Sequence, residues 1–436
     1  MTDHDLRNRY RFNLLAVCSA LAMLSAPAVA QTATAPVEDP APETEAPAIP
    51  LAGAKTRMKN LQVAMRDGAR LTTDVYLPDS DGPFPAILIR TPYNTEIRLQ
   101  SSYLDTFLAN GYAIVEQDER GRFLSEGEMH MLGNADEDGW DTLDWIAAQD
   151  WSDGNVATMG CSSSAENQLK LSTLGHPAHK GVIAYSSGVG IAEAGPFREQ
   201  GNFWRGGVWQ MGWANYFYAE MQVNQPQLPA GLSDIERQRL LADFKMEQGS
   251  AITQEDYLAA RMHLPVIDLG EVLGAPSTEI EDYLTRGPSG AIWAEDRITN
   301  GDTPKVPGLY AEALYDISAR SAAARFEQTR AASAPGTQAL MLINGGHCSY
   351  RRQSDESTIG DRPVGDMRYD YTSRELNFLN HWLKRDDTAP LPEQPVTVYM
   401  AGINRWVSFD AIPISGNDET LTFYLSSGGS ANTLSG

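Results

Sequence analysis

The chain has 436 residues and a formal net charge of −23, and 42% of its residues are hydrophobic. This length and composition allow two or three globular domains with buried cores. The strongly acidic balance argues against nucleic acid or an anionic membrane surface as a partner, and it carries no information about a substrate.

The first 30 residues are predicted to be a secretory signal peptide. Three arginines precede an apolar segment at 12–24, which is too short for a permanent membrane anchor, and Ala28-Val29-Ala30 resembles a cleavage site. We therefore expect export to a periplasm or to the cell exterior, with no membrane anchor after cleavage. Residues 31–50 are rich in Ala, Pro, Thr and Glu without apolar periodicity, which predicts a flexible linker.

From residue 51 onward, strand patterns alternate with helical patterns, which is typical of a mostly parallel sheet with crossover helices. Alternating residues around the turn Arg66-Asp67-Gly68 predict a β-hairpin at 59–78. The next elements are predicted from continuous apolar runs for strands and from helical spacing for helices. They are strands at 85–90, 112–117 and 181–186, and helices at 103–109 and 137–149.

The alternation stops after residue 188 and resumes at residue 306. Residues 196–299 contain helical stretches at 235–244 and 254–262 and no apolar strand run, so we expect a helical insertion there. Further strands are predicted at 306–315 and 339–344, followed by an amphipathic helix at 374–383. Alternating patterns at 395–401 and 420–425 predict the first strands of a separate β domain.

The predicted organisation therefore has six parts. They are a signal peptide (1–30), a linker (31–50), a first core segment (51–195), a helical cap (196–300), a second core segment (301–390) and the beginning of a truncated β-sandwich domain (391–436).

A Gly-x-Ser sequence, Gly160-Cys161-Ser162, joins a strand pattern directly to a helical pattern at 165–173. This is the layout of a nucleophile elbow, in which a sharp turn raises one serine above the edge of a sheet. A glycine leaves room for the turn, and the N-terminus of the following helix supplies N–H groups for a developing oxyanion. The usual motif is Gly-x-Ser-x-Gly, and its last position is Ser164 here, so by itself the sequence also fits an ordinary turn.

A nucleophilic serine needs a base and an orienting carboxylate, and the α/β-hydrolase order is serine, acid, histidine. His347 follows a predicted buried strand in a glycine-flanked loop that can aim an imidazole, and Asp316 directly follows another strand. His263 and His381 fall in helical patterns and are expected to be structural. The histidines lack the spacing of metal ligands, so a metallohydrolase is disfavoured, and we expect neither a metal nor a cofactor.

Segments from about residue 58 to the C-terminus resemble the cocaine-esterase-like branch of the X-Pro dipeptidyl-peptidase families of α/β-hydrolases. The resemblance implies an α/β-hydrolase core with Ser162 as nucleophile, Asp316 as acid and His347 as base. It also implies two oxyanion donors, the hydroxyl of Tyr93 and the backbone N–H of Ser163. The matching segments are Met65-Arg66-Asp67-Gly68, Arg90-Thr91-Pro92-Tyr93, Asp118-Glu119-Arg120-Gly121, Ser125-Glu126-Gly127, Trp151-Ser152-Asp153-Gly154-Asn155-Val156, Leu314-Tyr315-Asp316, and Met400-Ala401-Gly402-Ile403-Asn404-Arg405-Trp406.

Some positions leave alternatives open or depart from the family pattern. Tyr93 could instead be a loop residue that only packs its ring. The segment 118–121 could contact a charged substrate or form a structural ion-pair loop. Ser163 and Ser164 replace the bulky residue and the glycine often found after the nucleophile. For the family's C-terminal jelly roll two alternatives stay open, a drastically shortened domain or a sequence that is a fragment.

The expected function is that of a secreted serine hydrolase that cleaves esters or amides through a covalent acyl-enzyme. Carboxylic esters are favoured as its small-molecule substrates, with Xaa-Pro peptides and β-lactam side-chain or amino-acid esters as alternatives. Amino-acid esters are disfavoured because Ile317, Ser318 and Ala319 stand where amino-acid-ester hydrolases carry carboxylates. The alternative of another class is a catalytically silent binding protein on the same fold.

The insertion is expected to cover the active site as a lid with an apolar acyl pocket. Its aromatic residues could equally form the insertion's own small core. They include Trp204, Trp209, Trp213, Tyr216 and Tyr218.

Two cysteines remain after the signal peptide, and each is the neighbour of a predicted catalytic residue. If Ser162 and His347 meet, Cys161 and Cys348 also come close, and an oxidising compartment then favours a disulfide. The arrangement resembles the motif of tannases and fungal feruloyl esterases, in which a bridge ties the nucleophile to the base. The alternative is two buried thiols that act as small hydrophobic groups.

Overall fold

The computed structural model describes most of the chain between residues 54 and 412. Within this range it leaves undescribed 94–100, 130–133, 196, 201–202, 206, 213–230, 234, 237–238, 240–251, 275–278, 288–289, 291–292, 295–296 and 318. The predicted signal peptide and linker, the predicted strand at 420–425, and most of the predicted helix at 235–244 lie outside the described residues.

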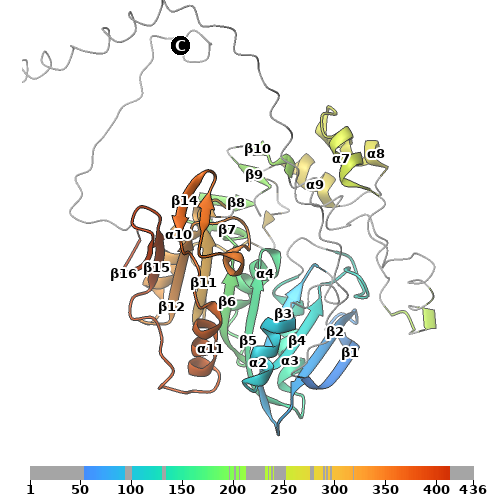
Figure 1. Ribbon diagram of the computed structural model, residues 1–436. Helices are drawn as coiled ribbons and strands as arrows, with labels where there is room; N and C mark the ends of the chain where they lie inside the picture. The colour runs from blue at the N-terminus through green and yellow to red at the C-terminus, as the bar shows by residue number, and fades with distance from the viewer. Residues whose placement is uncertain are drawn as a thin grey trace, which may run out of the picture. The chain divides into compact units, whose positions relative to one another are not determined.

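A ten-stranded sheet with the order β1-β2-β4-β3-β5-β6-β11-β12-β15-β16 runs through the structure (Figure 1). All neighbours from β4 to β15 are parallel, and the pairs at both edges are antiparallel. This is the α/β-hydrolase sheet that the strand and helix alternation predicted, so the fold prediction is confirmed. The strands are β1 (Ala54–Ala64), β2 (Arg70–Pro78), β3 (Phe84–Thr91), β4 (Ala113–Asp118), β5 (Ser152–Cys161), β6 (His179–Tyr185), β11 (Gly308–Ala313), β12 (Gln338–Ile343), β15 (Val396–Met400) and β16 (Arg405–Phe409).

Helices cover both faces of the sheet, which explains why its inner strands are apolar throughout. Ile87 and Leu88 are neighbours in β3, point to opposite faces and are both fully buried. Ile87 packs in one cluster with Phe107 and Phe378, and Leu88 packs in another with Leu143. The helices that flank the sheet are α2 (Ser101–Ala109), α3 (Glu137–Ala147), α4 (Ser163–Ser172), α10 (Ala319–Ala332) and α11 (Tyr371–Trp382).

The prediction of a purely helical insertion is wrong at its beginning, where two short antiparallel hairpins lie. The first pairs β7 (Ile191–Ala194) with β8 (Phe197–Gln200), and the second pairs β9 (Trp204–Arg205) with β10 (Val208–Trp209). These strands are only two to four residues long, too short to show a clear period in the sequence.

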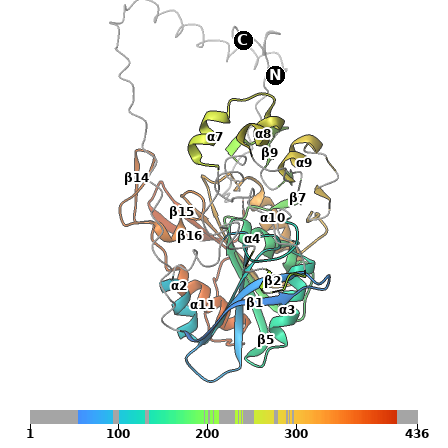
Figure 2. The same ribbon diagram turned by 90° about the vertical axis from the view of Figure 1, so that its right-hand side faces the viewer.

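Helices follow the hairpins, and α7 confirms the helix predicted at 254–262. Figure 1 shows α7, α8 and α9 gathered beyond β9 and β10, and Figure 2 shows the same three helices close together. These helices are α7 (Gln254–Ala260), α8 (Leu269–Leu273) and α9 (Glu279–Arg286). The insertion then returns to its starting point, because Ile298 forms a parallel bridge with Ala192 in β7.

The C-terminal strand predicted at 395–401 exists as β15, but it does not begin a separate β domain. β15 pairs in parallel with β12, and β16 pairs antiparallel with β15, so both extend the central sheet. Val396 and Val398 are buried in the same cluster as Leu340 of β12. The domain boundary predicted at residue 391 is therefore corrected for the described residues, which continue the hydrolase sheet to Phe409.

The residue pattern did not predict α10, which lies between β11 and β12. A further small hairpin, β13 (Ser357–Ile359) with β14 (Arg362–Gly365), lies between β12 and α11. No helix within the described part of the chain is long and apolar enough to cross a membrane.

Candidate active site

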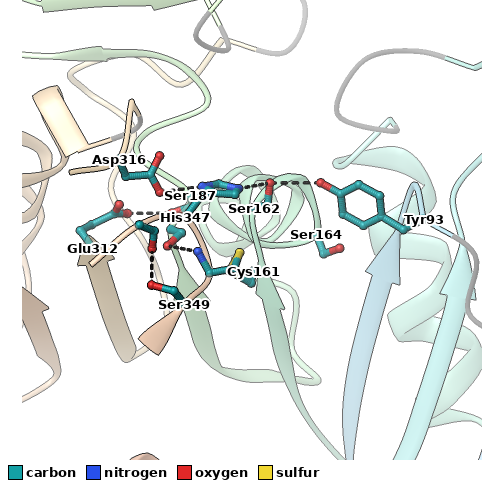
Figure 3. The surroundings of a disulfide bond; sticks show 12 residues. Tyr93, Cys161, Ser162, Ser164, Ser187, Glu312, Asp316, His347 and Ser349 are labelled. Carbon is teal, nitrogen blue, oxygen red and sulfur yellow. Dashed lines mark hydrogen bonds and ion pairs between the residues drawn. A yellow bond between two sulfur atoms is a disulfide. The ribbon is translucent and has the colours of Figure 1, made fainter. Parts of the chain in front are cut away.

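Four polar side chains that are distant in sequence meet at one edge of the sheet. Tyr93 follows β3, Ser162 follows β5, Asp316 follows β11 and His347 follows β12. These four strands run in the same direction, so their carboxyl ends lie at the same edge. Figure 3 shows the four side chains in a row, with Tyr93 approaching Ser162 from the side opposite to His347.

Hydrogen bonds connect the four side chains in one continuous series. The Nε2 atom of His347 lies 2.7 Å from Oγ of Ser162, and its Nδ1 atom lies 2.6 Å from Oδ2 of Asp316. The hydroxyl of Tyr93 donates to the same serine oxygen at 3.0 Å. The Asp316 side chain is 1% exposed, whereas 46% of the His347 side chain is exposed. A buried carboxylate therefore orients a half-exposed imidazole whose other nitrogen reaches the serine hydroxyl, as a general base needs.

The backbone around Ser162 has the conformation of a nucleophile elbow. Its φ of 61° and ψ of −136° lie in a region that residues other than glycine rarely adopt. The strained residue is held because its N–H donates to the carbonyl of Tyr185 at 3.0 Å, and its own carbonyl accepts from the N–H groups of Ala165 and Glu166. Strand β6 and helix α4 thus fix the position of the serine.

Gly160 is required because helix α4 lies directly on the end of β5. A Cβ atom at this position would lie 2.4 Å from the carbonyl oxygen of Ser164 and 2.7 Å from the backbone nitrogen of Ala165. These contacts are with backbone atoms, which cannot rotate away. The first glycine of the motif is therefore explained by close packing between strand and helix.

The loop that carries His347 is anchored at the residue directly after the histidine. Cys348 forms a disulfide with Cys161, with 6.2 Å between the two Cα atoms, so the predicted bridge is present. The Cys348 backbone has a φ of 51°, and its N–H donates to Oγ of Ser186 at 3.1 Å. The bridge links the residue before Ser162 to the residue after His347 across 187 positions of sequence.

Tyr93 combines the two alternatives that the sequence left open, a hydroxyl directed at the nucleophile and a ring that packs in the core. Its hydroxyl reaches Ser162, and its ring packs against the apolar core of the insertion, which includes Ile191, Phe203 and Trp293. The other expected donor, Ser163, is the first residue of α4. The first N–H groups of a helix have no acceptor within the helix, so they are available to an anion at that end.

The loop 118–121 is an ion-pair loop, as the structural alternative predicted. Arg120 contacts the carboxylate of Asp138 at 2.6 Å and that of Asp67 at 2.8 Å. The next arginine, Arg122, donates through Nε to the carbonyl of Pro92 at 2.7 Å. The network thus supports the residue that precedes Tyr93.

Two glutamates near the site, the buried Glu119 and the partly buried Glu166, have strongly raised pKa values. Burial is the largest cause of the rise in the pKa of Glu119 to about 8, and Arg90 and Arg122 oppose it. Burial also raises the pKa of Glu166 to about 8, with the charge of Glu312 as the second cause. Both carboxyls are therefore largely protonated at neutral pH, which limits the negative charge around the nucleophile.

No group of three or more His, Cys, Asp or Glu side chains in the described part of the chain is arranged to hold a metal ion. His263 lies 3.9 Å from Asp268 next to α8, and His381 lies on α11. Neither contacts the four side chains at the sheet edge.

Comparison with known proteins gives the class and then the family. The topology of the sheet and the solved structures described below define the class as the α/β-hydrolase fold. Residues 67–349, more than half of the chain, match the family described as X-Pro dipeptidyl-peptidase (S15 family), and the chain belongs to this family.

The relatives include a cocaine esterase from Rhodococcus sp. (strain MB1 Bresler), which is 43% identical over 120 residues, 27% of this chain and 21% of that protein. A solved α-amino acid ester hydrolase superposes with a TM-score of 0.63 at 23% identity, covering 88% of this chain and 63% of the other. An aminopeptidase from the marine sediment archaeon Thaumarchaeota archaeon superposes with a TM-score of 0.63 at 23% identity, covering 85% and 61%. The chain thus spans less than two thirds of the length of these relatives, and the two structural likenesses show the fold alone.

The residue pattern identified Ser162, Asp316, His347 and the disulfide, and the family resemblance added Tyr93. It missed the contact between Thr91 and Ser164, which lies beneath them. Both residues stand in segments already singled out, one in Arg90-Thr91-Pro92-Tyr93 and the other at the position where the elbow motif lacks its glycine. Their pairing depends on the approach of β3 and α4, which no local pattern encodes.

Proposed function

We propose that this protein is an exported carboxylic ester hydrolase that acts through Ser162, His347 and Asp316 and a covalent acyl-enzyme. The observation that carries the proposal is the unbroken chain of hydrogen bonds from Asp316 through His347 and Ser162 to Tyr93. Each hydroxyl or ring N–H in this series has an acceptor. The members supply the acid, the base, the nucleophile and the oxyanion donor that acyl transfer requires.

In the proposed mechanism, Oγ of Ser162 attacks the substrate carbonyl carbon while its proton passes to Nε2 of His347. The carbonyl oxygen becomes an oxyanion that accepts hydrogen bonds from the Tyr93 hydroxyl and the Ser163 N–H. The tetrahedral intermediate collapses when His347 returns the proton to the leaving alkoxide. Water then attacks the acyl-enzyme by the same route, with His347 again as base, and releases the acid and the free serine.

Esters are favoured over the alternative substrates by the similarity to a cocaine esterase over 120 residues. Xaa-Pro peptides are the second candidate, because the family carries that activity in its name. Amino-acid esters remain disfavoured, since Ile317 stands half exposed where a carboxylate would be needed to bind the substrate ammonium.

The insertion is proposed to act as a lid over this site. Support comes from Tyr93 and Met129, two residues outside the insertion that pack against its apolar core. The rings of Phe203, Tyr283 and Trp293 also pack against one another in that core, with Tyr283 and Trp293 stacked, so the aromatic residues stabilise the insertion itself. Trp213, Tyr216 and Tyr218 lie outside the described residues.

The test of the catalytic proposal is the Ser162→Ala variant. It should lose labelling by an organophosphonate probe, and kcat should fall by several orders of magnitude. Ser163→Ala is the matched control, because it keeps the backbone N–H and should keep the label. Labelling that survives in Ser162→Ala and disappears in Ser163→Ala would show that the wrong serine was assigned.

The substrate class is tested separately with a series of p-nitrophenyl esters and an Xaa-Pro anilide. We expect a higher kcat/KM for the esters. Exclusive cleavage of the anilide would establish the peptidase alternative instead.

Export is proposed from the N-terminal sequence, and a disulfide is typical of an oxidising compartment. Expression of the full chain in a Gram-negative host, followed by fractionation, should recover a product that begins at Gln31 outside the cytoplasm. Recovery of the uncleaved chain from the cytoplasm alone would contradict this part of the proposal.

A further inference from the structure

We propose that Thr91 and Ser164 form a positioning pair that fixes the two oxyanion donors relative to each other. The inference rests on the proposed function, because it assigns these residues an effect through Tyr93 and Ser163. The two donors belong to different elements, one to the loop after β3 and one to the start of α4. An error of about 1 Å in such a constellation can cost about 10²-fold in rate, so the spacing must be held.

Thr91 is the point at which these two elements meet. Its Oγ1 atom accepts a hydrogen bond from the backbone N–H of Tyr93 at 3.2 Å and another from the hydroxyl of Ser164 at 2.8 Å. Oγ1 of Thr91 is thus hydrogen-bonded to Tyr93, which carries one oxyanion donor. It is also hydrogen-bonded to Ser164, the neighbour of Ser163, which carries the other donor. Thr91 is 2% exposed and Ser164 is 1% exposed. Water therefore has little access to replace either bond, and a buried bond fixes geometry more firmly than an exposed one.

A second set of contacts closes the connection between the same two elements. The carbonyl of Thr91 accepts from the backbone N–H of Glu119 at 2.9 Å. The carboxyl of Glu119 in turn accepts from the side-chain amide of Asn167, which lies on α4 one turn after Ser164. The end of β3 and the first two turns of α4 are therefore joined at two points, and the second connection passes through the loop after β4.

The pair also explains the departure from the glycine motif. A glycine at position 164 would leave Oγ1 of Thr91 without this donor, whereas serine supplies one. Ser164 can supply it because it lies on the side of α4 that faces the end of β3. The serine at this position therefore takes part in building the oxyanion hole.

The experiment measures kcat and KM for one p-nitrophenyl ester with Thr91→Val, Thr91→Ser and Ser164→Ala, each alone and combined with Tyr93→Phe. Thr91→Val keeps the shape of the side chain and removes both hydrogen bonds. It should lower kcat about 10-fold or more at a KM within about 2-fold, because only transition-state binding is impaired. Thr91→Ser restores the hydroxyl and should recover most of this loss. Ser164→Ala removes one bond of the two and should cost about 3–10-fold in kcat.

The combination with Tyr93→Phe separates positioning from general stability. Once the tyrosine hydroxyl is absent it can no longer be misplaced, so Thr91→Val should then cost no more than about 2-fold. The matched control is Thr158→Val, which removes a hydrogen bond of 3.0 Å to Nε2 of the buried His179, away from the site. It should lower the free energy of unfolding and leave kcat unchanged.

The inference is wrong if Thr91→Val keeps wild-type kcat. It is also wrong if the reduction in kcat of the double variant equals the product of the reductions in Thr91→Val and Tyr93→Phe. If Thr91→Val fails to fold, Ser164→Ala decides the question, because it deletes a single oxygen atom. The reduction in kcat that Ser164→Ala causes must then disappear when it is measured in the Tyr93→Phe background. Failure of the proposed function gives a different result, namely a Tyr93→Phe variant with wild-type kcat. That outcome removes the oxyanion role of Tyr93 and the positioning role together.

Discussion

The serine at the centre of the site is held in a backbone conformation that costs free energy. A non-glycine residue in such a region costs about 1–3 kcal/mol, and it persists only where its surroundings enforce it. For Ser162 the hydrogen bond to Tyr185 of β6 and the first turn of α4 provide this enforcement. Ser186 and Cys348 also have positive φ values, of 46° and 51°, and the N–H of Cys348 donates a hydrogen bond to the hydroxyl of Ser186. Three residues with positive φ thus help to place the nucleophile and the base.

Tyr93→Phe tests the oxyanion role with the smallest possible change. The variant keeps the ring that packs against the insertion and removes only the hydroxyl that lies 3.0 Å from Ser162 Oγ. We expect kcat to fall by about 10²–10³-fold, because one donor to the transition state is lost. KM and the free energy of unfolding should stay nearly unchanged, and steady-state kinetics with denaturant titration check all three. A variant with wild-type kcat would reduce Tyr93 to a packing residue.

At the scale of elements, the site depends on how closely α4 approaches β5. Gly160→Ala would place a methyl group 2.4 Å from the carbonyl oxygen of Ser164, so the helix must move away from the strand. We expect a loss of about 1–3 kcal/mol in the free energy of unfolding, because overpacking of a tight contact costs about this much. The kcat should fall as well, since α4 carries Ser163.

The control for this prediction is Gly402→Ala. A Cβ atom at Gly402 would meet nothing within 4 Å, so its effect on stability should stay within about 0.5 kcal/mol. Equal stability of the two variants, measured by urea denaturation, would contradict the close packing of α4 on β5.

The disulfide connects two elements, the end of β5 and the loop after β12. For a separation of 187 residues, chain entropy gives at most about 5 kcal/mol of stabilisation. Its larger effect should be on geometry, because it ties His347 to Ser162 through their neighbours. Reduction should therefore lower activity at denaturant concentrations that leave the fold intact, and the Cys161→Ala/Cys348→Ala variant should behave like the reduced enzyme.

Activity is measured against reductant concentration, with circular dichroism on the same samples. Intact-mass analysis after alkylation without reductant supplies the control. Two alkylated thiols in active, exported enzyme would mean that the bridge does not form.

At the scale of the whole molecule, buried carboxyls make stability depend on pH. Burial raises the pKa of Glu119 from an ordinary value near 4.5 to about 8 in the folded state. The folded protein then binds a proton that the unfolded chain has released between these two values. The contribution of Glu119 is therefore fully present below pH ~4.5, falls by up to about 1.4 kcal/mol per pH unit as pH rises, and is lost above about pH 8.

Glu119→Gln removes this titration and should flatten the decline of the free energy of unfolding between pH 5 and 8. Glu166, whose pKa burial also raises to about 8, should leave a residual slope of the same sign. The exposed Glu271 provides the control, because Glu271→Gln should leave the slope as in the wild type. Denaturant titrations at four pH values measure the slopes. An unchanged slope in Glu119→Gln would show that this carboxyl does not carry the proton.

Local residue patterns were enough to predict the parallel sheet and the chain order of the candidate site residues, because both depend on short segments. Apolar runs mark the buried strands, and Ser162, Asp316 and His347 each stand directly after one. Since the carboxyl ends of parallel strands share one edge, strand prediction alone brought the three residues together and with them Cys161 and Cys348.

Strand pairing and contacts between distant side chains depend on which segments become neighbours, so only the folded structure shows them. The pattern at 395–401 correctly predicts a strand, but only pairing with β12 shows that it extends the hydrolase sheet instead of opening a new domain. The hairpins of the insertion are too short to have a measurable period, and their pairing partners alone define them. The bond between Thr91 and Ser164 joins residues 73 positions apart. A polar contact of this kind needs two side chains to meet within about 3 Å, and that distance is set by the packing of α4 on the sheet.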